Sequence, residues 1–289
     1  MRRHGVLILL GLVALAASTS TAGSPATVAW DKIIGADPGD LDAAQKARGE
    51  SILGTAANTR GCKGTLASCL AAGDQTARRH AGFVARMVRK GKADDVILAG
   101  IADRAKSAFP DEVMKIDVAD HPLNGPAGAK VVLVEFACFE CPFCAHLAPQ
   151  LAKLQGKFGD KVAHYYKFFP VRSHARGVPS ALAGLAAHLQ GKFWKMAELM
   201  FANRTDLTDD DVLGYASQAG LDVAKFKTDI ADAASMKFIE KDKLEGMRVG
   251  VEGTPTFFVN GKLYRGLADF EELVDRIGEE IDILEGRIQ

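Results

Sequence analysis

The sequence lacks an excess of charge of either sign and has no long apolar run beyond its first residues. Lysine and arginine together number 36, as do aspartate and glutamate, so the formal net charge is +0. A neutral chain has no overall field that would attract nucleic acid or an acidic partner. After residue 23, no apolar stretch approaches the roughly 20 residues that a membrane-spanning helix needs. Internal repeats and low-complexity tracts are also missing, so we expect a soluble globular protein that does not bind nucleic acid.

Residues 1–23 have the order of a secretory signal peptide. A basic start at residues 2–4 precedes an apolar run over residues 6–17, and small residues follow up to Gly23. We therefore expect cleavage near Ala22 and export of the mature chain. Export would place the five cysteines where disulfides persist.

The mature chain, about 265 residues, has the length of one or two domains. Residues 24–111 are predicted to form an N-terminal helical region, because they show helical periodicity and no β-rich run. A basic cluster at residues 78–92 falls on one of these helices, and we interpret it as a solvated helix face. Beyond a boundary near residue 111, the pattern predicts strands and helices in alternation, interrupted by a helical stretch at about 173–250. The predicted elements are strands 131–137, 162–169, 256–259 and 262–265, a short β-like piece at 115–118, and helices 145–157, 223–243 and 268–283.

The most informative motif is Cys141-Pro142-Phe143-Cys144, which follows an apolar strand and opens a predicted helix. At a helix start, unpaired backbone N–H groups and the positive end of the helix dipole favour the thiolate of the first cysteine. The second thiol can then close a disulfide and release a bound partner. The motif therefore predicts a redox-active pair, with a structural disulfide or an idle thiol pair as the alternative.

Together with Thr254-Pro255, these pieces resemble the DsbA-type disulfide oxidoreductases of the thioredoxin superfamily. The resemblance implies an α/β protein, with a thioredoxin fold over residues 112–289 that carries the helical insertion and follows the N-terminal helical region. It also implies no cofactor beyond the cysteine pair, and no metal. The resemblance covers residues 115–283 and rests on Glu135-Phe136, the Cys141–Cys144 motif, Pro149, Phe168-Phe169-Pro170, the long helical insertion, and Gly253-Thr254-Pro255.

The resemblance also implies roles for the residues of the motif. Cys141 would be the nucleophile, more exposed and lower in pKa, and Cys144 the buried resolving thiol. Pro142 and Phe143 lie between them at positions that tune the thiolate in this family, and they would face the substrate. Because neither is charged, one source of thiolate stabilisation is missing.

Two further places around the cysteines are implied by the family. Pro255 would be a cis proline, which lets the backbone of Thr254 pair with an extended substrate beside the sulfurs. Glu135 and Lys167 would lie under the disulfide, where a buried carboxylate can take a proton from the resolving thiol. A charged pair at a strand end is the alternative. His164 and His174 are assigned to structure.

The remaining three cysteines permit more than one interpretation. Cys62 and Cys69 would be too far apart on one continuous helix, but a bend at Gly64-Thr65 would permit a structural disulfide. A second redox centre is the alternative. Cys138 extends the motif to a spacing that superficially resembles part of an iron–sulfur run, although no fourth cysteine follows. We expect a buried thiol there, with a third redox partner as the alternative.

The expected function is a periplasmic thiol–disulfide oxidoreductase that exchanges the Cys141/Cys144 disulfide with folding proteins through a mixed disulfide. Its partners would be unfolded or folding proteins with thiols, and a membrane redox protein that resets the pair. An oxidase is favoured because the helical insertion resembles that branch of the family. An isomerase or reductase stays open, as does a non-catalytic protein that binds peptides or copper in the same cleft.

Overall fold

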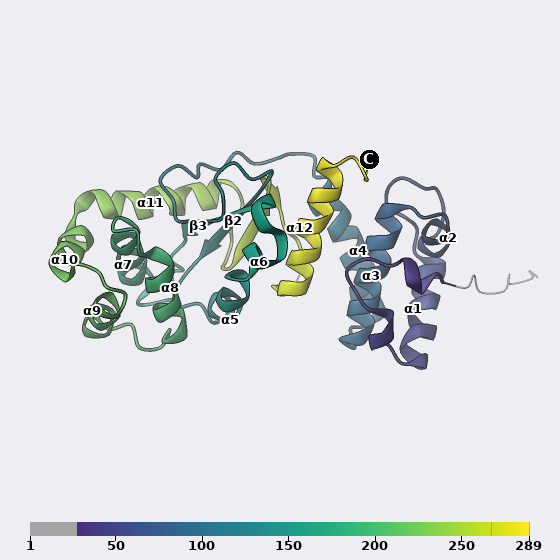
Figure 1. Cartoon of the computed structure of the whole chain (residues 1–289), viewed down its shortest axis with the longest axis horizontal. Helices are drawn as coiled ribbons and strands as arrows, with labels where there is room; N and C mark the ends of the chain where they lie inside the picture. The colour runs from purple at the N-terminus through teal and green to yellow at the C-terminus, as the bar shows by residue number, and fades with distance from the viewer. Residues whose placement is uncertain (1–27, 267, 289) are drawn as a thin grey trace, which may run out of the picture.

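The computed structural model describes residues 28–266 and 268–288, so the predicted signal peptide lies outside the described residues. The molecule is elongated (Figure 1). The N-terminal helices form one end, the sheet lies in the middle, and the helices of the insertion form the other end. Within the described ranges, no helix combines the length and the apolar character needed to cross a membrane.

The N-terminal region is helical, as the sequence predicted, and from residue 28, where the described part begins, it contains four α-helices. Asp42 starts the first with a capping box to Gln45, and Asp74 caps the third by accepting a hydrogen bond from the backbone N–H of Ala77. Leu53, Leu66 and other apolar side chains fill a core among the helices. The elements are the 3₁₀ turns Trp30–Lys32 and Pro38–Asp40, and helices α1 (Ala43–Thr55), α2 (Leu66–Ala71), α3 (Gln75–Arg89) and α4 (Asp94–Ala108).

A five-stranded mixed sheet forms the centre of the chain. The strands are β1 (Leu123–Asn124), β2 (Val131–Ala137), β3 (Val162–Phe168), β4 (Thr256–Val259) and β5 (Lys262–Leu263), and their order is β1-β3-β2-β4-β5. β2 and β3 run parallel, as expected for a βαβ unit, and the other pairs are antiparallel. The β-like piece expected at 115–118 is not a strand, and the edge strand is β1 instead.

Helices cover both faces of this sheet and extend beyond it. Two predicted helices are each divided: 145–157 becomes α5 and α6, and 223–243 becomes α10 and α11, because Asp232 caps a new helix there. The helices are α5 (Pro142–Leu151), α6 (Leu154–Phe158), α7 (Gly177–His188), α8 (Phe193–Ala202), α9 (Asp209–Gln218), α10 (Val223–Ala231), α11 (Ala233–Arg248) and α12 (Phe270–Leu284), with a 3₁₀ turn at Gly159–Lys161.

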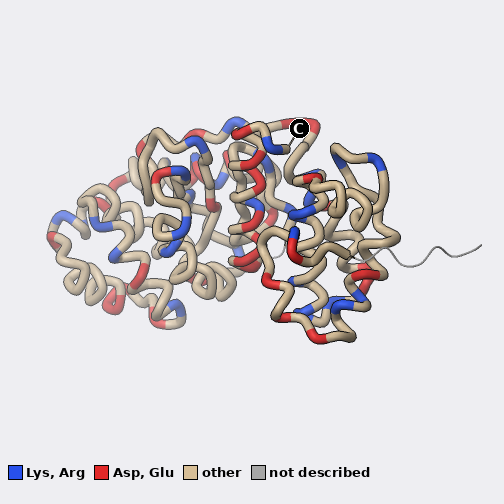
Figure 2. The backbone as a smooth tube through the Cα atoms, turned by 45° about the vertical axis from the view of Figure 1, so that its right-hand side comes forward, with Lys and Arg blue, Asp and Glu red and all other residues tan. Residues whose placement is uncertain are grey.

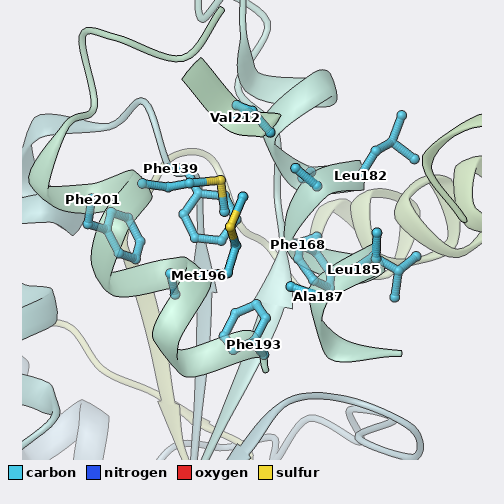
Figure 3. Packing of buried hydrophobic residues seen from close by; sticks show 14 of the residues in the cluster. Phe139, Phe168, Leu182, Leu185, Ala187, Phe193, Met196, Phe201 and Val212 are labelled. Atoms are coloured by element: carbon cyan, nitrogen blue, oxygen red, sulfur yellow. The ribbon is translucent and has the colours of Figure 1, made fainter. Parts of the chain in front are cut away.

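The insertion, α7 to α11, packs on the sheet end next to the Cys141–Cys144 motif. Phe139, just after β2, stacks on Tyr166 of β3 with 5.4 Å between ring centroids, and Phe201 of α8 lies 4.8 Å from Phe139. Figure 3 shows these apolar side chains converging from the strands and from α7 and α8. The two cysteines of the motif belong to this same buried cluster, so the insertion encloses the motif from one side.

Buried ion pairs join the N-terminal helical region to α12, which corrects the interpretation of the basic cluster. Arg86 of α3 lies 2.6 Å from Glu272 and 2.8 Å from Asp275, and Arg79 lies 2.8 Å from Asp275. Arg104 of α4 approaches the same Asp275 at 2.9 Å. Figure 2 shows acidic positions along α12 beside basic positions of the N-terminal region. The prediction of a solvated face is thus wrong for Arg79 and Arg86, which are buried against a helix far along the chain.

Candidate active site

The Cys141–Cys144 motif sits where β2 passes into α5. The backbone N–H of Cys141 donates to the carbonyl of Cys138 at 3.1 Å, which closes a tight turn, and Cys141 is the N-cap residue of α5. Pro142 occupies the first helical position, where a missing backbone N–H costs nothing. The sulfur of Cys141 therefore lies at the positive end of a helix, as the sequence predicted.

Cys141 is the thiol that ionises readily. A hydrogen bond with the Cys144 thiol is the largest influence and lowers the Cys141 pKa, while burial opposes it. Interactions with Thr254 and with the backbone N–H groups of Cys144 and Phe143 lower it further, and the pKa falls to about 5. With that pKa, Cys141 is mostly thiolate at neutral pH.

Cys144 has the opposite character. Burial is the main reason that its pKa is raised well above the usual value, and the nearby Cys141 and Glu135 raise it further. Cys144 is 0% exposed and Cys141 only 3%. As expected, Cys141 is more exposed than Cys144. Cys141 is nevertheless buried, so a partner protein must approach its sulfur past the surface residues around it. Pro142 and Phe143 are both exposed, Phe143 at 64%, and they form that surface.

The loop before β4 completes the site from far along the chain. The Thr254-Pro255 peptide bond is cis. When protonated, the Cys141 thiol donates to the carbonyl oxygen of Thr254 at 3.1 Å. The structure therefore brings together Cys141, Cys144, Thr254 and Pro255, which the sequence predicted as one site.

The expected pairing of Glu135 with Lys167 is wrong. Glu135 pairs in register with Tyr166 across β2 and β3, while Lys167 pairs with Phe136. Because successive side chains of a strand point to opposite faces, Lys167 lies on the other face of the sheet from Glu135. Its ammonium group binds Asp242 at 2.8 Å instead.

The partner of Glu135 is a histidine that the sequence had assigned to structure. His164 precedes Tyr166 by two residues on β3, so it shares the face of Glu135, and its Nε2 lies 3.0 Å from Glu135 Oε2. Both side chains are buried, at 1% and 4% exposure. A carboxylate and an imidazole can share and pass a proton, and Glu135 lies close enough to Cys144 to raise its pKa.

Tyr166 is a second residue that the sequence did not single out. Its hydroxyl is buried and makes no hydrogen bond with any residue that the structure describes. Burial, and then the nearby Cys144 and Cys138, raise its pKa well above the usual value, so it stays a neutral phenol. The only signal in the sequence was its place on β3, two residues after His164 and therefore on the same face of the strand.

Cys138 is a buried free thiol, 3% exposed. Its sulfur lies 3.3 Å from Nδ1 of His174, and burial is the main cause that raises its pKa. Cys138 is therefore a protonated thiol in these surroundings. Among residues 28–266 and 268–288, no three His, Cys, Asp or Glu side chains are arranged to hold a metal ion.

The other two cysteines form a disulfide in the N-terminal helical region. Cys62 and Cys69 have Cα atoms 5.6 Å apart. The chain bends between them, with an isolated bridge between Ala57 and Thr65, and Thr65 caps the short helix that carries Cys69. Figure 1 shows α2 well separated from α5, so this disulfide lies away from the Cys141–Cys144 motif.

The family profile and the solved structures agree on the fold. The sequence profile of a family described as thioredoxin matches residues 118–279. Among solved structures, oxidised BdbD from Bacillus subtilis is 22% identical with a TM-score of 0.54, covering 59% of this chain and 97% of its own. A thioredoxin-like oxidoreductase from Silicibacter pomeroyi DSS-3 is 25% identical with a TM-score of 0.50, covering 61% and 97%.

The curated proteins with similar sequences are named as antiporters and not as oxidoreductases. A protein named Na(+)/H(+) antiporter NhaA 1 from Mycolicibacterium gilvum is 35% identical over 158 residues, which is 54% of this chain and 25% of that protein. A protein named Na(+)/H(+) antiporter NhaA from Herminiimonas arsenicoxydans is 36% identical over 150 residues, 52% and 24% respectively. This chain spans about a quarter of the length of these relatives, so their transport activity is not carried over to it.

Proposed function

This chain belongs to the thioredoxin family, whose profile matches more than half of it, and we propose that it is a DsbA-type thiol–disulfide oxidoreductase acting as an oxidase. The observation that carries the proposal is the contrast within one motif. Cys141 ionises readily at the start of α5 beside the Thr254-Pro255 loop, while Cys144 is held protonated. An idle or purely structural thiol pair has no need of that contrast.

The proposed reaction begins with Cys141 and Cys144 joined as a disulfide. A substrate thiolate attacks the Cys141 sulfur, the bond to Cys144 breaks, and a mixed disulfide with Cys141 forms. A second substrate thiolate then attacks the substrate's own sulfur and releases Cys141 as a thiolate. The substrate loses two electrons and the cysteine pair gains them. The low pKa of Cys141 makes it a good leaving group in this last step.

Cys144 leaves in the first step and needs a proton, since its thiolate is disfavoured by burial. We assign that proton to the Glu135–His164 pair, with Glu135 as the group that gives it to Cys144 and later takes it back. His164 is a positioning residue that holds Glu135 in place by a hydrogen bond. The alternative, a buried pair with only a structural role, leaves the pH dependence of exchange unchanged when either residue is replaced.

The preference for oxidation follows from the same pKa. A stabilised Cys141 thiolate exists only in the reduced pair, so it favours reduction of the pair and makes the disulfide a stronger oxidant. We also propose that the chain acts in the periplasm and that a membrane redox protein resets the pair. The basic, apolar and small-residue order of residues 1–23 supports export.

The test is oxidative refolding of a reduced protein that contains disulfides, with glutathione disulfide as the terminal oxidant. Wild type at a substoichiometric amount should accelerate refolding over many turnovers. Cys141→Ser should abolish this, while the matched control Cys138→Ser, which changes a neighbouring buried thiol, should keep it. Binding of one reduced protein per chain without turnover would overturn the proposal in favour of a non-catalytic peptide-binding protein.

A further inference from the structure

Tyr166 places a hydroxyl inside the apolar cluster that holds the Cys141–Cys144 motif. The residue is 1% exposed. Its ring is fixed by three aromatic neighbours that Figure 3 labels, with centroid distances of 5.4 Å to Phe139, 5.2 Å to Phe168 and 4.9 Å to Phe193. The hydroxyl makes no hydrogen bond with any residue that the structure describes. A phenylalanine would fill the same space without burying a polar group, so packing does not account for this hydroxyl.

The side chain of Tyr166 lies among the reactive groups of the site. It pairs in register with Glu135 across β2 and β3, so both side chains are on the same face of the sheet. It also belongs to one buried cluster with Cys138, Cys141 and Cys144. Burial is the main cause that raises the Tyr166 pKa, and Cys144 raises it next, followed by Cys138 and Glu135. Those three side chains are therefore the candidate partners of the hydroxyl.

Two of the three candidates already have a lasting partner. The Cys138 sulfur lies 3.3 Å from a histidine nitrogen, and a Glu135 oxygen lies 3.0 Å from another. Cys144 shares a hydrogen bond with Cys141. That hydrogen bond is temporary, because it requires a thiol proton and is lost when Cys141 is joined to a substrate sulfur. Cys144 is thus the group that needs a new partner during the reaction.

The need arises in the first step of the proposed reaction. The substrate thiolate attacks Cys141, and the electron pair of the broken S–S bond leaves on Cys144. Because Cys144 is 0% exposed, water does not stabilise this charge before a proton arrives. A neutral phenol forms a strong hydrogen bond to a thiolate. Tyr166 stays neutral, since burial, the main cause, raises its pKa well above the usual value.

We propose that Tyr166 donates a hydrogen bond to the Cys144 sulfur as that sulfur leaves the disulfide. Once the S–S bond is broken, the Cys144 side chain is free to turn about its Cα–Cβ bond toward the fixed hydroxyl. The phenol transfers no proton, and the proton that Cys144 gains comes from Glu135, as assigned above. This inference rests on the proposed function and adds to it a residue that acts on the leaving group.

The proposed hydrogen bond exists only while Cys144 is a thiolate. In the disulfide its sulfur carries no charge, and in the reduced pair burial keeps Cys144 protonated. The hydroxyl therefore stabilises the transition state and neither end state. Its loss should slow reduction and oxidation of the cysteine pair by the same factor and leave their equilibrium unchanged.

The test compares two variants of neighbouring tyrosines in the full chain. Tyr166→Phe removes the hydroxyl and keeps the packed ring. Tyr165→Phe is the matched control, because Tyr165 is also buried but pairs with Val134 and faces the other side of the sheet. The measured quantity is the rate constant for reduction of the disulfide by dithiothreitol, followed by mass spectrometry of acid-quenched samples. Tyr166→Phe should lower it about tenfold, which corresponds to ~1.4 kcal/mol, and Tyr165→Phe should not change it.

Two further measurements distinguish this role from a structural one. Alkylation of reduced Cys141 by iodoacetamide does not require Cys144 to leave, so Tyr166→Phe should react at the wild-type rate. The equilibrium of the pair with glutathione should also stay at the wild-type value. Equal slowing of alkylation and reduction, a shifted equilibrium, or reduction of Tyr166→Phe at the wild-type rate would overturn the proposal.

Stability gives a second contrast. A hydroxyl without a partner contributes no hydrogen bond to the folded state, so Tyr166→Phe should unfold at a urea concentration no lower than wild type. Unfolding at clearly less urea would assign the hydroxyl a structural bond and refute the inference. Failure of the proposed function is recognised separately, because wild type itself would then not catalyse oxidative refolding.

Discussion

The ionisation of Cys141 depends most on its hydrogen bond with the Cys144 thiol, so Cys144→Ala should raise the Cys141 pKa. A hydrogen bond to a charged group contributes about 1.5–3 kcal/mol, and one pKa unit corresponds to about 1.4 kcal/mol. The pKa should therefore rise from about 5 in wild type by ~1 to 2 units. It stays below the ordinary thiol value, because the helix start and the Thr254 loop remain in place.

The assay is the rate of alkylation of reduced protein by iodoacetamide as a function of pH, followed by mass spectrometry of the peptide that carries Cys141. The thiolate is the reactive form, so the rate rises as pH rises through the pKa. At about pH 5.5, a pKa near 5 leaves roughly three quarters of Cys141 ionised, and a pKa near 6.5 leaves roughly a tenth. Cys144→Ala should thus react about eightfold more slowly there, and at a rate similar to wild type near neutral pH and above.

Cys144→Ser is the matched control, because its hydroxyl can still donate to the Cys141 sulfur and should keep the midpoint near 5. Cys141→Ser should remove the reaction at low pH altogether, since Cys138 is buried with a raised pKa. The reasoning is refuted if the alanine and serine variants share one midpoint, or if wild type titrates near the ordinary value for a thiol.

Three further predictions concern the rest of the structure. Glu135→Gln should slow reaction of the disulfide about a hundredfold and shift its pH profile, and His164→Ala should shift the same profile; unchanged profiles in stopped-flow measurements would leave the pair a structural role. Arg86→Met should lower the free energy of unfolding in urea by about 3–5 kcal/mol, because the buried carboxylates of Glu272 and Asp275 each lose a guanidinium partner; a loss below ~1 kcal/mol, typical of an exposed pair, would contradict this. Replacing both Cys62 and Cys69 by alanine should cost about 2.5 kcal/mol by the loop-entropy relation while leaving thiol exchange at Cys141 intact; loss of exchange would argue for a second redox centre.

Patterns of neighbouring residues were enough to predict from the sequence that Cys141 lies between a strand and a helix. Cys141 follows an apolar strand and opens a helix, and both elements are determined by nearby residues. The helical insertion was also readable, since helical periodicity is a local property. The link between Cys141 and Thr254, 113 residues apart, came only through the family resemblance.

What the sequence could not provide was the register of neighbouring strands and the pairing of distant helices. The partner of Glu135 depends on which residue of β3 lies opposite it, and a shift by one residue exchanges the two faces. That is why Lys167 was chosen and His164 was missed. Likewise, α3 reads as a basic surface helix until α12, nearly 200 residues later, supplies the carboxylates that bury Arg86.

The most direct test of the central claim is the equilibrium of the Cys141/Cys144 pair with reduced and oxidised glutathione at neutral pH. Because the Cys141 thiolate stabilises the reduced pair, the account predicts a reduction potential clearly less negative than about −270 mV, the value of the reducing protein thioredoxin. A potential at that value or below it would contradict the account, because it would mean that the Cys141 thiolate gives the reduced pair no advantage.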